Sequence, residues 1–321
     1  MLESLLVPLD GSLLAENVLP HVIALARSFA SHITLLHVLE QNQQRHAASA
    51  VDPLTWQLNK AEAAAQLDNV RTRLQQAGLE VETALLEGHA AEQIVDFAQT
   101  ENMSLIVLGS HAQSGISRWN ISSVVQKIVL SAPTSLMIVR AYQTAAPDLT
   151  GQQYRRLIVP LDGSWRAEAV IALTIQLART HHGSLHLTQV VGRPEVVGRT
   201  PPTQEDLELV NRLIERNVVE ATHYLEQLTS RLPNEGVDVQ TNVLTGHNVL
   251  TTLHEFVERE HIDLVVISAH GNSGEARWPY GSLVNNFIIY GMTPLLIVQD
   301  LPSKMTIPTQ VAVAVREHSG H

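Results

Sequence analysis

Short runs of aliphatic residues alternate with longer amphipathic segments along this chain. The runs 33–39 and 105–108 are almost entirely apolar, whereas segment 13–30 carries apolar residues at helical spacing. Such alternation is typical of strands and helices that follow one another, and it predicts parallel βαβ units. In the first part of the chain we expect strands at 4–8, 33–39, 80–86, 105–108 and 135–139, and helices at 13–30, 54–77, 90–99 and 122–130.

The same pattern then occurs a second time. Leu-Asp-Gly-Ser at 9–12 returns at 161–164, and Gly-Ser-His at 109–111 corresponds to Ser-Ala-His at 268–270. The offset grows from 162 − 10 = 152 to 270 − 111 = 159, which predicts a small insertion in the second copy. A period this long indicates two whole domains. The second copy is expected to have strands at 157–160, 185–191, 238–244, 264–267 and 295–298, and helices at 165–180, 205–231, 249–260 and 282–290.

The predicted fold class is therefore α/β, with two tandem, doubly wound, Rossmann-like domains. We expect the first domain at 1–141, a linker at 142–154, the second domain at 155–300 and a tail at 301–321. Polar or Pro/Gly-rich loops follow the second strand of each copy. Loops in that place lie over the carboxyl edge of the sheet, where open α/β folds bind their ligands.

Composition narrows the function classes. The formal charge of −11 disfavours binding to nucleic acid or to anionic membranes. The chain has no cysteine, which excludes disulfides, thiol catalysis and zinc–thiolate sites. It also has no run of about 18 apolar residues that would span a membrane. We therefore expect a cytoplasmic protein without a nucleic-acid or membrane partner.

The second copy contains residues suited to an anion site. Gly271 is followed, after nine residues, by Gly281 and Ser282, which open the last predicted helix. Glycines allow backbone N–H groups to approach a ligand closely, and a helix N-terminus offers unpaired donors at the positive end of its dipole. Asp162 ends the first strand at the same edge, where a carboxylate can accept a hydrogen bond from a ribose hydroxyl.

At this point the chain resembles the universal stress protein family. The resemblance rests on Pro-Leu-Asp-Gly-Ser after the first strand, His37-Val38 in the second, and Gly109-Ser110-His111 after the fourth. It covers nearly the whole chain as two tandem copies. It implies five-stranded parallel sheets of order 3-2-1-4-5. It also implies pairing through the last strands, either within the chain as an intramolecular pseudo-dimer or between chains as a homodimer.

The resemblance implies a set of nucleotide-binding residues in the second copy. Asp162 and the backbone near Pro160 would face the ribose and adenine, the Val190 backbone the adenine edge, and Ile267 the sugar. The helix start would hold phosphates. Two positions depart from the family pattern, namely Ser268 in place of a glycine and Asn272 in place of a basic residue. The implied residues are Pro160, Leu161, Asp162, Gly163, Val190, Ile267, Ser268, Gly271, Gly281, Ser282, Leu283 and Val284.

The first copy keeps less of this pattern. Ala112 and Ser122 stand where the pattern has glycine. If those positions need close phosphate contact, both changes should weaken the site, so we expect nucleotide mainly in the second domain. The retained candidates in the first copy are Asp10, Val38, Gly109 and Ser123.

Several of these residues also have purely structural interpretations. Gly271 and Gly281 are also typical of loops and helix caps, and Asp10 and Asp162 are also typical of Asx turns or helix N-caps. The matching pairs Arg118-Trp119 and Arg277-Trp278 are interpreted as loop packing, although Arg277 has the reach for a phosphate.

The 16 histidines do not form a recognisable metal motif. His182 and His186 are four residues apart, but Gly183 and the following strand place them across a turn, so we do not predict a metal site there. His111 and His270 are interpreted as structural.

The predicted function is binding of an adenine nucleotide to regulate a stress response. ATP is the expected ligand, with ADP and AMP as alternatives and Mg²⁺ accompanying the nucleotide, and an unidentified protein is the downstream partner. The chain has neither a P-loop nor a dinucleotide fingerprint, and no general base beside a nucleophile is evident. Two alternatives stay open, a scaffold that acts through protein contacts without nucleotide and, less favoured, a slow ATPase.

Overall fold

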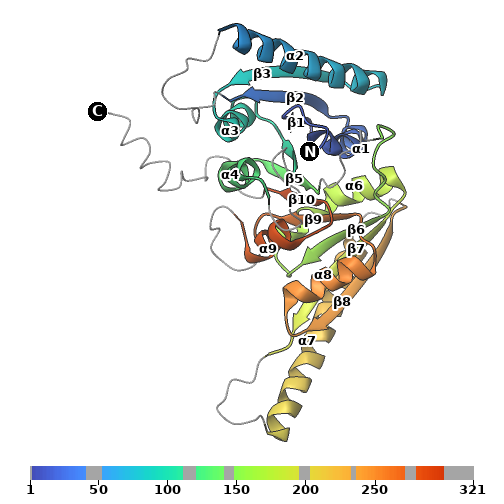
Figure 1. Cartoon of the computed structure of the whole chain (residues 1–321). Coiled ribbons are helices and arrows are strands. Elements are labelled where there is room, and N and C mark those ends of the chain that lie inside the picture. Colours follow the sequence, from blue (N-terminus) through green and yellow to red (C-terminus); the bar gives the residue numbers. More distant parts are fainter. Residues whose placement is uncertain are drawn as a thin grey trace. The chain divides into compact units, whose positions relative to one another are not determined.

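The computed structural model describes residues 2–40, 53–110, 121–140, 148–194, 203–232, 236–271 and 280–299. They fall into two compact units (Figure 1). Of the described residues, the first unit contains 2–152 with Tyr280 and Gln299, and the second contains 153–271 and 281–298.

The first unit is a parallel sheet in the order β3-β2-β1-β4-β5, as predicted. Leu5 of β1 is in register with Ile33 of β2 and Leu105 of β4, which places β1 in the interior of the sheet. Its strands are β1 (Ser4–Pro8), β2 (His32–Leu39), β3 (Val81–Glu87), β4 (Leu105–Gly109) and β5 (Ser135–Val139). Its helices are η1 (Ala15–Val18), α1 (Leu19–Phe29), α2 (Pro53–Gln76), α3 (Ala90–Thr100) and α4 (Ser123–Ser131).

The second unit repeats this topology in the order β8-β7-β6-β9-β10. Leu157 of β6 is in register with Leu185 of β7 and Leu264 of β9. Its strands are β6 (Arg156–Leu161), β7 (Ser184–Gly192), β8 (Asp238–Gly246), β9 (Leu264–Ser268) and β10 (Leu295–Val298). Its helices are α5 (Trp165–Glu168), α6 (Ile171–His181), α7 (Gln204–Arg231), α8 (Val249–Arg259) and α9 (Ser282–Tyr290).

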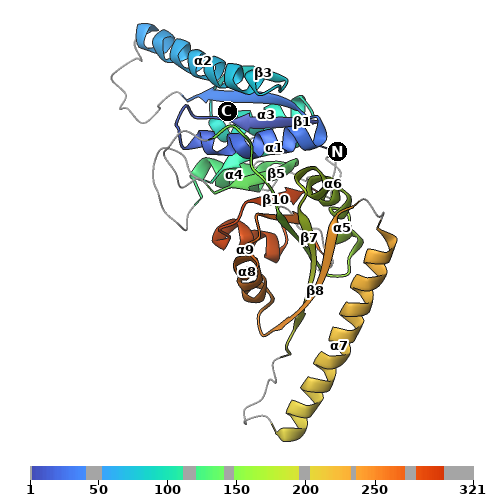
Figure 2. The ribbon, with the colours of Figure 1, turned by 90° about the vertical axis from the view of Figure 1, so that its right-hand side faces the viewer.

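Burial explains why the interior strands are continuous aliphatic runs. All five residues of β9 are buried, and so are the first four of β4. Such strands have helices on both faces and therefore need apolar side chains on both. The outer strand β3 has only Val81 buried, and this is consistent with its mixed polar and apolar sequence. In each unit the last two helices lie close together, α3 beside α4 (Figure 1) and α8 beside α9 (Figure 2).

Two predicted helices are interrupted near their start. The segment predicted as helix 13–30 forms the short η1 and then α1, because Pro20 has no N–H to donate to the carbonyl of Glu16. The segment predicted as 165–180 likewise divides into α5 and α6, although no proline is present there. The helices after these breaks, α1 and α6, each end at a residue in the left-handed region, Ala30 with φ 52° and His182 with φ 51°.

The described part of the predicted linker is packed against helices and strands. The Gln152 N–H donates to the Pro20 carbonyl at 2.9 Å, and the Arg27 guanidinium donates to the Thr150 carbonyl at 3.0 Å. Tyr154 is fully buried in the second unit, where its ring meets that of His181 edge-on at 5.1 Å. The remaining linker residues 142–147 and the predicted tail 301–321 lie outside the described residues.

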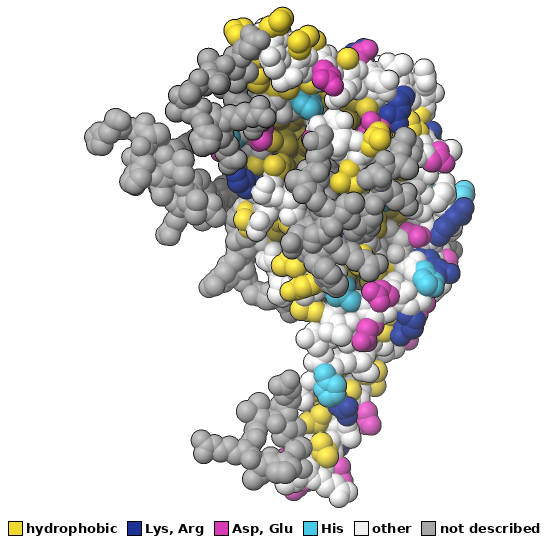
Figure 3. All heavy atoms as spheres, in the orientation of Figure 1, with side chains coloured by type: hydrophobic (Ala, Val, Ile, Leu, Met, Phe, Trp, Pro, Cys, Tyr) yellow, Lys and Arg dark blue, Asp and Glu magenta, His cyan; other side chains and the backbone are white. Residues whose placement is uncertain are grey.

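The face shown in Figure 3 has lysine and arginine side chains dispersed among acidic and polar ones, without a basic patch. This distribution fits the negative net charge. Within the part of the chain that the structure describes, none of the helices combines the length and apolar character needed to cross a membrane.

Candidate functional site

A cavity of about 370 Å³ opens at the carboxyl edge of the second unit's sheet. The ends of β6, β7 and β9 and the start of α9 surround it, as expected for a ligand site in an open α/β fold. The structure brings together there all the second-copy residues that the sequence suggested, with one exception. The lining candidates are Pro160, Leu161, Asp162, Val190, Ile267, Ser268, Gly271, Gly281, Ser282, Leu283 and Val284.

The exception is Gly163, which lies outside this cavity and borders a neighbouring hollow under α7. Its φ of +80° explains why this residue is glycine, because other residues rarely adopt that backbone conformation. The structure gives Gly163 a role in the turn between β6 and α5, and its contact with a ligand stays a prediction.

Asp162 takes part in both the turn and the cavity. Its Oδ1 accepts hydrogen bonds from the Ser164 N–H at 3.0 Å and the Ser164 hydroxyl at 2.6 Å. The Ser164 Oγ in turn accepts from the Ala167 N–H at 3.2 Å and caps α5. The Asx-turn interpretation is thus correct for Asp162, whereas Ser164 is the N-cap. Asp162 also lines the cavity, so the residue contributes to both features.

Gly271 is required by packing against that carboxylate. A Cβ atom built on Gly271 would lie against Asp162 Oδ2, closer than any real contact of a Cβ atom. A larger residue would therefore displace the acid. Gly271 is a packing partner of Asp162 as well as a loop glycine.

The N-terminus of α9 opens onto the same cavity. Gly281 is its N-cap, with its N–H donated to the Ala269 carbonyl at 3.0 Å. Since glycine has no side chain, it leaves the first-turn N–H groups of Ser282, Leu283 and Val284 without a cap from the N-cap residue. These donors stand at the positive end of the helix dipole, which favours an anion.

Three buried polar atoms belong to residues that line the cavity and have no hydrogen-bond partner among the described residues. They are Thr188 Oγ1, Gln189 Oε1 and Ser268 Oγ. Thr188 and Ser268 are respectively 0% and 4% exposed. A buried polar group without a partner costs about 1–3 kcal/mol, so such a cluster at a cavity is typical of a ligand site.

Sequence reasoning missed part of the wall. Thr188 and Gln189 directly precede the candidate Val190, and the end of β7 as a whole was the available signal. Val249 and Leu253, one helical turn apart at the start of α8, close the apolar side. β6 ends at Leu161, which is in register with Gln189 of β7. The next residue of β7, Val190, is therefore paired with β8 alone, and its other side faces the cavity.

The first unit has a corresponding cavity of about 330 Å³. Asp10, Val38 and Gly109 line it as expected, but Ser123 does not and is exposed. Ser122, which corresponds to Gly281, caps α4 by accepting a hydrogen bond from the Val125 N–H at 3.2 Å. The helix end that is uncapped in the second unit is therefore occupied by a side chain in the first.

The two histidines that were considered as metal ligands lie in different environments. His182 ends α6 and is exposed, whereas His186 is buried in β7 beside Ser184 and Asn242. In the described ranges, no group of three or more acidic or histidine side chains is placed to hold a metal ion. His111, Ala112, Arg118, Trp119, Asn272, Arg277 and Trp278 lie outside the described residues.

Each of the curated relatives matches less than half of this chain. Universal stress protein MJ0531 from Methanocaldococcus jannaschii is 26% identical over 139 residues, which is 43% of this chain and 82% of its own length. Universal stress protein YxiE from Bacillus subtilis is 27% identical over 153 residues, 44% of this chain and 100% of its own.

Solved structures match the whole chain. A universal stress protein from Archaeoglobus fulgidus superposes with a TM-score of 0.62 at 17% identity, covering 92% of this chain and 98% of its own. The functionally unknown protein PA1789 from Pseudomonas aeruginosa gives 0.65 at 13% identity, with 99% and 97% covered. The model of the universal stress protein family matches residues 1–140 and again 153–299. The chain therefore belongs to the universal stress protein family, as a tandem member with two family domains.

Proposed function

We propose that the second unit binds an adenine nucleotide, with ATP as the principal ligand, and that this binding lets the chain regulate a stress response. The observation that carries the proposal is the uncapped start of α9 at Gly281, which faces a cavity also lined by Asp162. Such an arrangement provides donors for phosphate at one end and an acceptor for ribose hydroxyls at the other.

The chemistry of the cavity wall fits such a ligand. The N–H groups of Ser282, Leu283 and Val284 and the Ser282 hydroxyl would donate to phosphate oxygens. The buried hydroxyls of Thr188 and Ser268 would gain partners from the polar parts of the ligand. The apolar surfaces of Val190, Val249, Leu253 and Ile267 suit a planar base. A Mg²⁺ ion would be held mainly by the phosphates, as this ion usually is.

Exchanging the two helix caps tests this proposal. Gly281→Ser should place a hydroxyl at the start of α9, where it would accept from the Val284 N–H as Ser122 accepts from the Val125 N–H in the first unit, and so compete with phosphate. Isothermal titration of the full chain with ATP should show roughly a tenfold or greater loss of affinity. Stability should change by only a few tenths of a kcal/mol, since serine and glycine are both good N-caps.

Ser122→Gly is the matched control. It should leave the affinity of the second unit for ATP unchanged, because the altered cap belongs to the other domain. Equal loss of ATP binding from both substitutions, or no measurable ATP binding by the unaltered chain, would contradict the proposal and favour a scaffold that acts through protein contacts. Phosphate release measured on the same samples would reveal a slow ATPase.

A further inference from the structure

The cavity of the first unit is formed but is not accounted for by the proposed nucleotide site. It lies at the ends of β1, β2 and β4, and its volume of about 330 Å³ is close to that of its counterpart. A domain that binds no ligand would be more stable if side chains filled this space, because close packing stabilises a protein core. Its apolar lining consists of Pro8, Leu9, Ala15, Leu36, Val38, Ala90, Ile94, Leu108, Val124, Val125 and Ile128.

Both helix N-termini at this cavity already have side-chain acceptors. The Ser122 Oγ accepts from the Val125 N–H of α4, and Glu40 Oε1 accepts from the Ala90 N–H of α3 at 2.9 Å. A phosphate would have to displace one of these acceptors, and the Glu40 carboxylate would repel it. The cavity is therefore poorly suited to a phosphorylated ligand.

Acidic side chains dominate the polar part of the wall. Asp10 and Glu40 line the cavity and are exposed to solvent, and the described lining residues include no lysine or arginine. His37 is half-buried, and burial lowers its pKa although Asp10 acts in the opposite direction. The lowered pKa favours the neutral imidazole at neutral pH. The described part of the polar wall therefore carries net negative charge, in contrast with the start of α9, whose free end of the dipole favours an anion.

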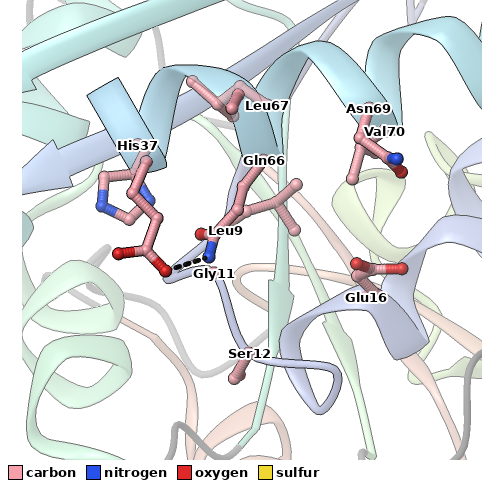
Figure 4. A pocket seen from close by; sticks show the side chains of 11 residues that line it. Leu9, Gly11, Ser12, Glu16, His37, Gln66, Leu67, Asn69 and Val70 are labelled. Carbon is pink, nitrogen blue, oxygen red and sulfur yellow. Dashed lines mark hydrogen bonds between the residues drawn. The ribbon is translucent and has the colours of Figure 1, made fainter. Parts of the chain in front are cut away.

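A second hollow of about 320 Å³ adjoins this cavity and shares Leu9 and His37 with it. Figure 4 shows it under α2, with Gln66 from that helix and Glu16 from η1. Glu62 also lines this hollow, and its carboxylate accepts a hydrogen bond from the Gln66 amide at 3.5 Å. Glu16 is neutralised by an ion pair with Arg73 at 2.7 Å. The hollow therefore adds space and the further charge of Glu62 beyond His37.

We propose that the first unit binds an unphosphorylated organic cation. The apolar body of the ligand would lie against the aliphatic wall, and its protonated nitrogen would lie beside Asp10 and Glu40. Asp10 holds its own turn through Oδ1, which accepts from the Ser12 N–H at 2.9 Å, so its charge is fixed at the cavity rather than mobile. Unlike the second unit, this cavity has apolar or ring side chains where Thr188 and Gln189 stand, namely Leu36 and His37.

Three probes of similar size and different charge test the proposal on the full chain. Tyramine is cationic, 4-ethylphenol is neutral and 3-(4-hydroxyphenyl)propionate is anionic. Ligand-observed NMR titration should rank their affinities in that order, with tyramine about threefold to tenfold tighter than the neutral probe, as expected for exposed carboxylates. Glu40→Gln combined with Asp10→Asn should abolish the difference between tyramine and 4-ethylphenol while retaining the Oδ1 acceptor of the turn.

A matched pair of blocking variants assigns the site. Val124→Trp on α4 should eliminate tyramine binding and spare ATP, whereas Leu283→Trp at the corresponding position of α9 should do the reverse. Circular dichroism and thermal unfolding confirm that each variant is folded. Equal affinity for the three probes, no binding of any of them, or loss of tyramine through Leu283→Trp would overturn the cation site. Loss of the proposed nucleotide function would appear separately, as failure of the unaltered chain to bind ATP.

Discussion

The Oδ2 atom of Asp162 lies too close to the place where a Cβ atom of residue 271 would stand for both atoms to keep their positions. The acid at the end of β6 and the glycine after β9 are thus a steric pair, although 108 residues of sequence lie between them (271 − 162 = 109 positions). Asp162 can keep its position at the cavity only while residue 271 has no side chain.

Gly271→Ala should therefore reduce nucleotide affinity. The added methyl group would push the Asp162 carboxylate from its position, and the loss of one hydrogen bond to a charged group corresponds to about a tenfold to hundredfold fall in affinity. Isothermal titration with ATP measures the effect. Gly163→Ala is the control, because a Cβ atom there meets nothing within 4 Å. Its positive φ should cost about 1–2 kcal/mol of stability with affinity retained. An unchanged ATP affinity for Gly271→Ala would refute the steric pair.

Substitution of Asp162 should separate its two roles. Asp162→Asn keeps an Oδ1 acceptor for Ser164 but removes the charge, so it should weaken ATP binding by about tenfold with little loss of stability. Asp162→Ala removes both and should also cost about 0.5–2 kcal/mol of stability, as for a lost cap.

Asp10→Ala is the control for the turn alone, because Asp10 makes the same two hydrogen bonds to Ser12 in the first unit. It should match Asp162→Ala in stability but leave ATP binding unchanged. Denaturant unfolding and ATP titration on all three variants check this. If Asp162→Asn binds ATP normally, the ligand role of the carboxylate is excluded.

The buried His21 of α1 should make the chain less stable in mild acid. Burial lowers its pKa from 6.5 to about 4 in the folded protein, so between these values the unfolded chain binds the extra proton. Stability should accordingly fall as the pH drops from about 6.5 to 4, by up to about 3 kcal/mol at the lower end. Urea unfolding across this pH range, compared with that of His21→Leu, isolates the contribution. An identical pH dependence in both proteins would contradict it.

Tyr154 should be a major stabilising residue of the second unit. Its side chain is fully buried and packs edge-on against His181, so Tyr154→Ala should cost about 3–5 kcal/mol. Tyr154→Phe keeps the ring and should cost much less. Thermal and urea unfolding measure both. A small effect of Tyr154→Ala would contradict this prediction and would mean that Tyr154 contributes little to the core of the second unit.

The element order was predictable because each buried strand is a continuous aliphatic run and each helix carries one apolar face. Even the ends of β5, α9 and β10 match the sequence pattern. The breaks between η1 and α1 and between α5 and α6 were not predicted, because residues on both sides of each break have helical spacing. Pro20 was the available signal in the first unit, but the second unit has no such residue.

The candidate site was predictable where it consists of turns and helix starts, since Asp162 and Gly281 stand at such positions. The partners across the cavity were not predictable in the same way. That Gly271 packs against Asp162, or that the hydroxyls of Thr188 and Ser268 have no hydrogen-bond partner among the described residues, depends on distances between strands that no single segment encodes. Ser122 looked like a lost glycine, and only the hydrogen bond that its hydroxyl accepts from the Val125 N–H identified it as the N-cap of α4.

The Ser122 cap also bears on how a duplicated domain can change. Serine and glycine codons can differ by a single base, and both residues are accepted at a helix N-cap, so neither state requires a passage through an unstable protein. A tandem chain can thus lose or regain an anion-binding helix end in one half while the other half preserves it. Duplication followed by such a reversible step offers a short evolutionary route from two equal domains to two domains with separate ligands.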